Sequence, residues 1–173
     1  MKKSLLLFLL SVTLFGNSFS QDTTAIKKNI EAATKEMSAT FISRNWEEYV
    51  KYTHPAVVEM IGGKEKFVKI VSEFMTELPD SSIKFFELGK PMQLINSGHD
   101  WQTVIMQKLD IYIQGKMVRS VSYLVGESLD NGKTWTFFDS KGDREVVKKM
   151  KPDVSDKLII PAGSQVIDEN YKP

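Results

Sequence analysis

The chain has 173 residues, no cysteine, and a formal net charge of +1 at pH 7. Without cysteine it can form neither a disulfide nor a thiolate metal site. The near balance of basic and acidic residues gives no electrostatic reason to expect nucleic acid or an anionic membrane as a partner. We therefore expect one ordinary domain that folds around an apolar core.

The first 20 residues predict an export signal. Lys2 and Lys3 give a basic start, Leu5–Phe15 is almost wholly apolar, and Ser18 and Ser20 put small residues where signal peptidase cleaves. The apolar stretch is shorter than the roughly 20 residues that span a bilayer. We expect cleavage after residue 20 and a mature, soluble protein that is exported, either periplasmic or secreted, with no membrane partner once the signal is removed.

Composition changes again near the C-terminus, where a polar, proline-containing stretch begins at Lys151. We therefore divide the chain into a signal peptide at 1–20, one domain at 21–150 and a C-terminal extension at 151–173.

Apolar residues recur at helical spacing between Thr24 and Leu78. The second predicted helix ends near His54, because Pro55 disfavours the helical conformation in the residue before it. Val57–Ile61 then predicts a short strand, and Gly62-Gly63 separates it from the third helix. The three predicted helices cover residues 24–45, 46–54 and 64–78.

From Ile83 to Phe138 the apolar residues recur at strand spacing instead. Helices followed by a run of strands are typical of an α+β fold, in which helices pack on one face of a mostly antiparallel sheet. The first two strands are expected to be separated by a turn at Gly89-Lys90-Pro91. The predicted strands are Ile83–Leu88, Met92–Ile95, Trp101–Ile113, Met117–Leu129 and Lys133–Phe138, and a short helix follows at Asp143–Met150.

This order of elements, and the stretch from Asn45 to Phe67, resemble the nuclear transport factor 2-like superfamily, which includes SnoaL-like and ketosteroid-isomerase-like domains. The resemblance covers residues 24–140 and implies a curved sheet wrapped around the helices, a cone-shaped half-barrel with an apolar pocket at its open end. Members of this superfamily bind small hydrophobic molecules, catalyse isomerisation or dehydration, or pair with other proteins.

A second motif, Ser128–Trp135, matches the Asp-box pattern Ser-x-Asp-x-Gly-x-Thr-Trp of sialidase hairpins. Asp130 is placed to accept backbone N–H groups, Gly132 to adopt a positive φ, and Trp135 to pack under the hairpin. One copy after three helices cannot build a β-propeller. We therefore predict a well-formed hairpin and carry over no glycosidase chemistry.

Residues on the inner face of the cone are the candidates for a ligand site. Alternation along the longest strand places Trp101 and Gln107 on that face. A three-residue loop at Asp130-Asn131-Gly132 sets Tyr123 opposite Asp139, and alternation adds Arg119. The predicted ligand-binding group is Trp101, Gln107, Arg119, Tyr123 and Asp139.

The inward position of Arg119 depends on the neighbouring turn. If Gln114-Gly115 forms a two-residue turn, Asp110 lies opposite Arg119, and the arginine forms a cross-strand ion pair on the solvent face instead.

Three functions remain open from the sequence. We favour an exported, non-enzymatic module that binds a small apolar ligand or a protein partner. The alternatives are an isomerase or dehydratase, with Asp139 as base and Tyr123 as donor, and a structural domain that forms a homodimer. No metal ion is expected, because His54 and His99 share no helix or strand face with other ligand residues. No cofactor is expected, because the sequence contains no phosphate-binding glycine loop or cofactor fingerprint.

Overall fold

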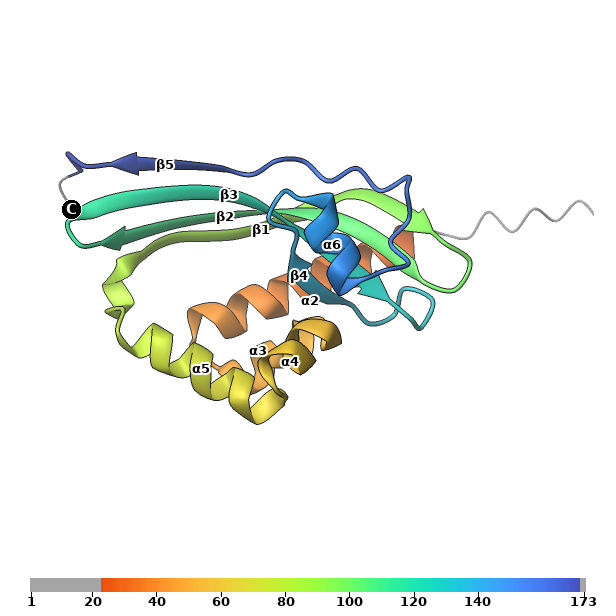
Figure 1. Cartoon of the computed structure of the whole chain (residues 1–173), viewed down its shortest axis with the longest axis horizontal. Coiled ribbons are helices and arrows are strands. Elements are labelled where there is room, and N and C mark those ends of the chain that lie inside the picture. Colours follow the sequence, from red (N-terminus) through yellow and green to blue (C-terminus); the bar gives the residue numbers. More distant parts are fainter. Residues whose placement is uncertain (1–22, 172–173) are drawn as a thin grey trace, which may run out of the picture.

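The computed structural model describes residues 23–171 and shows an α+β fold in which N-terminal helices precede a curved antiparallel sheet (Figure 1). The predicted fold class is confirmed. The predicted signal peptide lies outside the described residues. The helices are α2 (Thr23–Ile42), α3 (Trp46–Tyr49), η1 (Val50–Tyr52), α4 (Pro55–Ile61), α5 (Lys64–Thr76), η2 (Asp80–Ser82) and α6 (Arg144–Met150).

The sheet has the order β1-β2-β3-β4, and β5 pairs with the first half of β3 while β4 pairs with its second half. Every paired strand is antiparallel to its neighbour. In Figure 1 the helices α2 to α5 lie below the long, curved strands β1 to β3, and the sheet does not close into a barrel. The strands are β1 (Ile83–Asn96), β2 (Trp101–Ile113), β3 (Lys116–Ser128), β4 (Thr136–Asp139) and β5 (Ser164–Asp168).

The main core lies between α2 and the concave face of the sheet. Ile30 is fully buried on α2, and it belongs to one apolar cluster with Ile105 on β2 and Phe137 on β4. Burial of such large apolar side chains is the main stabilising term of a domain of this size. The other buried members of this cluster are Ile26, Met37, Trp101, Leu124 and Trp135.

A second core covers the opposite face of the sheet. Val104 and Val125 point away from α2 and pack with Val147 of α6 and with Leu158 of the C-terminal segment. All four side chains are at most 1% exposed. The segment after Met150, which the sequence sets apart as an extension, is therefore packed on the same sheet as the domain.

The predicted strand at Val57–Ile61 is wrong, because these residues belong to helix α4. His54 caps the helix: its Nδ1 accepts a hydrogen bond from the backbone N–H of Ala56 at 3.2 Å. Pro55 occupies the first turn, where its missing N–H costs nothing. Gly62 ends the helix in the left-handed conformation, with φ 101°.

The predicted turn at Gly89-Lys90-Pro91 is also wrong, because β1 runs through it as a single strand. Instead, the register between β1 and β2 shifts on both sides of Pro91. Since β1 is the edge strand of the sheet, the missing N–H of Pro91 leaves no central ladder bond unmade.

The turn between β2 and β3 has two residues, Gln114 and Gly115, with φ of 50° and 79°. Two consecutive positive φ values are typical of a tight hairpin turn whose twist matches that of the strands. The turn sets Asp110 opposite Arg119, as predicted for the case in which the arginine does not face the pocket.

The Asp-box sequence forms a wider loop than the three residues predicted. Asp130 Oδ1 accepts hydrogen bonds from Ser128 Oγ at 2.8 Å and from the backbone N–H groups of Lys133 and Thr134 at 3.1 and 2.9 Å. These bonds hold residues 129–135 outside the ladder, so that β4 begins at Thr136. The hairpin is well formed, but its strands pair in a register that differs from the predicted one by one residue.

Candidate functional site

A half-enclosed cavity of about 220 Å³ lies between the helices and the concave face of the sheet. Its walls are mostly apolar and come from helices α2 to α5 on one side and from β2, β3 and β4 on the other. Its lining includes more buried side chains than the larger surface hollows, which contain exposed residues such as Lys35, Lys90 and Phe74. The cavity is lined by Met37, Tyr49, Thr53, Val57, Phe67, Gln107, Leu124, Phe137, Phe138 and Asp139.

Four polar side chains line this cavity. The Oγ1 of Thr53 is buried and has no hydrogen-bond partner among residues 23–171. Gln107 uses its Nε2 to donate to Ser122 Oγ at 3.3 Å, and Asp139 Oδ1 accepts from the backbone N–H of Lys141 at 2.7 Å. Buried polar groups normally find partners, so Thr53 marks a place where a bound molecule would improve the hydrogen bonding.

Tyr49 supplies the fourth polar group, and its ionisation is strongly disfavoured. Burial, and next the negative charge of Asp139, raise the pKa of Tyr49 to about 12. The phenol therefore stays protonated at neutral pH and keeps a proton that it is able to donate in a hydrogen bond.

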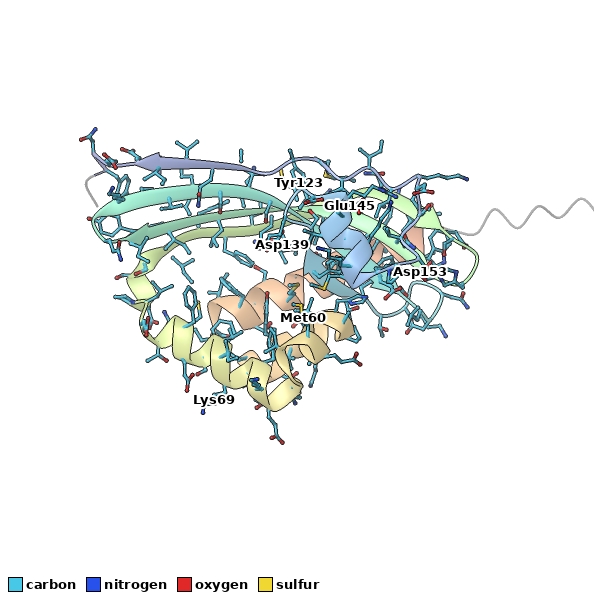
Figure 2. All side chains as sticks on the ribbon, viewed as in Figure 1. Met60, Lys69, Tyr123, Asp139, Glu145 and Asp153 are labelled. Carbon is cyan, nitrogen blue, oxygen red and sulfur yellow. The ribbon has the colours of Figure 1, made fainter. Side chains whose placement is uncertain are left out.

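The register of β3 and β4 decides which residues reach the cavity. Asp139 lies opposite Leu124, and Phe138 lies opposite Val125. The prediction that Tyr123 lies opposite Asp139 is therefore off by one residue, because the Asp-box loop is longer than expected. A shift of one residue turns a side chain to the other face of a sheet, and Figure 2 shows Tyr123 and Asp139 on opposite sides of the strands.

The structure brings only two members of the predicted ligand-binding group together, Gln107 and Asp139. Trp101 is buried in the core beside α2 and does not line the cavity. Tyr123 packs against the second core, on the opposite face. Arg119 lies 3.7 Å from Asp110 Oδ2, with its side chain 44% exposed, so the alternative cross-strand ion pair is confirmed.

Sequence reasoning missed Tyr49 and Thr53 as cavity residues. Tyr49 belongs to the helical pattern that begins at Trp46, and its position there did not show which way the ring would point. Thr53 forms a parallel bridge with Phe137 of β4, a tertiary contact with no local sequence signal.

A buried group of charges on the far side of the sheet was also missed. Lys151 follows α6, and its side chain is only 3% exposed. Its Nζ lies 2.6 Å from Asp100 Oδ2 and 2.9 Å from Asp153 Oδ1, and it also contacts Glu127 Oε1. We call these four residues, with the two histidines that contact them, the Lys151 cluster: Lys151, Asp100, Glu127, Asp153, His54 and His99.

Both histidines contact the outer oxygens of this cluster. His54 Nε2 lies 2.7 Å from Glu127 Oε2, and His99 Nε2 lies 2.6 Å from Asp153 Oδ2. The cluster therefore runs from His54 at the start of α4, through Lys151, to His99 in the loop before β2.

For Lys151 and Asp100, hydrogen bonds shift the pKa in the direction opposite to burial and outweigh it. Burial by itself lowers the pKa of Lys151, but hydrogen bonds to Asp100, Glu127 and Asp153 raise it above its ordinary value. Burial likewise raises the pKa of Asp100, yet hydrogen bonds from Lys151, Ser97 and Gln102 lower it to about 2. Both groups are therefore charged at neutral pH.

Within the described part of the chain, His99, Asp100 and Asp153 bring three donor atoms within 4.8 Å of one another. The Lys151 ammonium already lies against both carboxylates. Because that ammonium supplies the positive charge at this point, the geometry gives no case for a metal ion.

Among the described helices, none is long and apolar enough to cross a bilayer.

Comparison with known proteins found no matching family model, and no curated protein or solved structure matches the chain. The function of the cavity is therefore inferred from its lining, charge and access.

Proposed function

We propose that the protein binds a small, mostly apolar molecule in the cavity between the helices and the sheet. The observation that supports this proposal is a half-enclosed space of about 220 Å³ whose lining is mostly apolar, with four polar side chains among it. An apolar protein cavity of roughly 150 Å³ already accommodates benzene, so a one- or two-ring molecule matches this space.

The polar groups indicate the chemistry of the ligand. Asp139 places a carboxylate at the cavity, where its Oδ2 lies 3.4 Å from Lys141 Nζ. Its carboxylate and the unpartnered Oγ1 of Thr53 are both able to accept a hydrogen bond. A neutral ligand with a hydroxyl group at one end of an apolar body fits these features.

Two probes of similar shape test this proposal: 2-naphthol, which carries a hydroxyl group, and 2-methylnaphthalene, which lacks it. Equilibrium dialysis is expected to show binding of both, with 2-naphthol about 5-fold tighter because one hydrogen bond contributes about 1 kcal/mol. Asp139→Asn is expected to reduce this preference, because a neutral amide is a weaker acceptor than a carboxylate.

Tyr123→Phe provides the matched control, since Tyr123 lies on the other face of the sheet. It is expected to leave the affinity for both probes unchanged. Failure of both probes to bind the wild-type protein would contradict the proposed cavity function. Equal binding of both probes would contradict the role given to the polar groups of the cavity, but not the binding function itself.

The presence of both Tyr49 and Asp139 in the cavity lining favours one second candidate, proton-transfer catalysis of the isomerase or dehydratase type. In this case Asp139 acts as the base, and Tyr49 takes the donor role expected for Tyr123, because its phenol remains protonated. NMR detection of deuterium exchange at the α-carbon of 2-tetralone tests it. Exchange that is equally fast in wild type and Asp139→Asn would rule it out.

A further inference from the structure

Helix α4 is the least anchored wall of the cavity. None of its residues is buried, and it runs from His54 to the glycine pair Gly62-Gly63, both of which have positive φ. Val57 on this helix lines the cavity and also packs against the second core. The position of this wall therefore depends strongly on how the two ends of α4 are held.

His54 holds the first end by three separate hydrogen bonds. Its backbone N–H donates to the carbonyl oxygen of Phe137 on β4 at 2.9 Å. Its imidazole Nδ1 accepts from the N–H of Ala56 at 3.2 Å, and its Nε2 lies 2.7 Å from Glu127 Oε2. The ring also stands edge-on to Phe138, with centroids 5.1 Å apart.

These contacts require one protonation state of the ring. Nδ1 must be unprotonated to accept from Ala56, so the proton on Nε2 donates to the Glu127 carboxylate. Adding a second proton at Nδ1 converts the acceptor into a donor that faces another donor. The protonated ring therefore loses the bond that caps α4.

Charged groups of both signs lie near the His54 ring. Glu127 on β3 contacts the ring, and Lys151 contacts the other oxygen of that carboxylate. Asp100 and Asp153 lie beyond Lys151 and partly offset its charge. Phe138 on β4 contributes only an uncharged ring at this position.

We propose that His54 is a pH-sensitive anchor of the cavity wall, and that protonation of its Nδ1 releases the first turn of α4. The consequence for ligand entry rests on the function proposed above for the cavity, whereas the release of α4 does not. A fall in pH is the condition that tests this release, because acid adds a proton to an imidazole.

Amide hydrogen exchange measures this release without any ligand. The amides of Ala56, Val57 and Val58 all bond to His54, through its ring or its carbonyl oxygen. Their protection, corrected for intrinsic exchange rates, is expected to fall about 5-fold between about pH 7.5 and pH 5, since a lost cap costs about 1 kcal/mol.

The two histidines give a matched pair of variants. His54→Asn keeps a capping oxygen that does not titrate, and it is expected to remove the pH dependence of these amides. His99→Asn changes the other histidine of the Lys151 cluster and is expected to behave as wild type. Unchanged protection in the wild type, or the same pH dependence in His54→Asn, would overturn the proposal.

Nitrogen NMR of the histidine rings in the wild-type protein keeps the proposal testable if His54→Asn does not fold. At about pH 7.5 the proton of His54 is expected on Nε2. A proton on Nδ1 instead would contradict the capping bond and the proposal with it.

Binding of 2-naphthol over the same pH range then connects the anchor to the cavity. The association rate is expected to rise in acid for wild type and His99→Asn, and to stay constant for His54→Asn. If 2-naphthol does not bind at any pH, the cavity function fails while the exchange result still decides the role of His54. An association rate that is independent of pH, with normal binding, would contradict the link between α4 and ligand entry.

Discussion

The Nζ of Lys151 lies 2.6 Å from Oδ2 of Asp100, and the two side chains are 3% and 0% exposed. Lys151 directly follows α6, whereas Asp100 precedes β2. This buried ion pair therefore ties the start of the C-terminal segment to the sheet. Gln102 adds two further hydrogen bonds to the same carboxylate, at 2.9 and 3.2 Å.

Lys151→Met is expected to destabilise the protein by about 3 to 5 kcal/mol. The substitution keeps an unbranched side chain but removes the ammonium, so that Asp100 and Glu127 remain buried without their main partner. Urea unfolding monitored by tryptophan fluorescence measures the change in the free energy of unfolding.

Lys148→Met on α6 serves as the control, because Lys148 is exposed and lies 3.7 Å from Glu145 in an ordinary surface pair. Its expected cost is below about 1 kcal/mol. Equal effects of the two substitutions would show that the buried contacts of Lys151 contribute no special stability.

The lowered pKa of Asp100 predicts a loss of stability in strong acid. Its folded-state pKa of about 2 lies below the ordinary value of 3.8, so the ionised form favours folding. The resulting stabilisation, about 2 kcal/mol, is fully present above about pH 4 and is lost as the pH falls toward 2. Stability curves of wild type and Asp100→Asn should therefore converge over this range.

Asp156→Asn controls for the general effect of acid, because the Asp156 side chain is 95% exposed. Its difference from wild type is expected to stay nearly constant over the same range. A constant difference for Asp100→Asn as well would refute the linkage between its ionisation and folding.

The fold was predictable from the sequence because each half of the chain carries a single periodicity. The helical stripe on α2 follows directly from the face that this helix buries. The first half of β2 is buried on both faces, between the two cores. Helix α4 was not predictable in the same way. Its first turn depends on a capping bond from the His54 ring, whereas the apolar residues of Val57–Ile61 alone fit a strand equally well.

The candidate site was less predictable than the fold. Gln107 was assigned correctly because alternation along one strand suffices, whereas Tyr123 was not, because its face relative to Asp139 depends on the length of the Asp-box loop. Glu127 lies on the same face of β3 as Tyr123 and Val125, the face away from α2. It is buried only because the C-terminal segment folds back over that face, and no local pattern indicates such a contact.

Gly126→Ala is expected to destabilise the protein by about 1 to 3 kcal/mol through overpacking. A Cβ at this position would lie 2.7 Å from Phe137 Cε1 and 2.7 Å from Thr103 Cγ2, which is closer than real Cβ contacts. Because Phe137 lines the cavity, its displacement should also weaken 2-naphthol binding.

Gly89→Ala is the matched control for this substitution. Gly89 also lies within a strand, but its added Cβ would meet the carbonyl oxygen of Met106 at 3.4 Å, an ordinary contact. Urea unfolding and equilibrium dialysis of both variants separate the two positions. If Gly126→Ala retains wild-type stability and affinity, Phe137 has room to move without entering the cavity, and its packing does not define the size of the binding site.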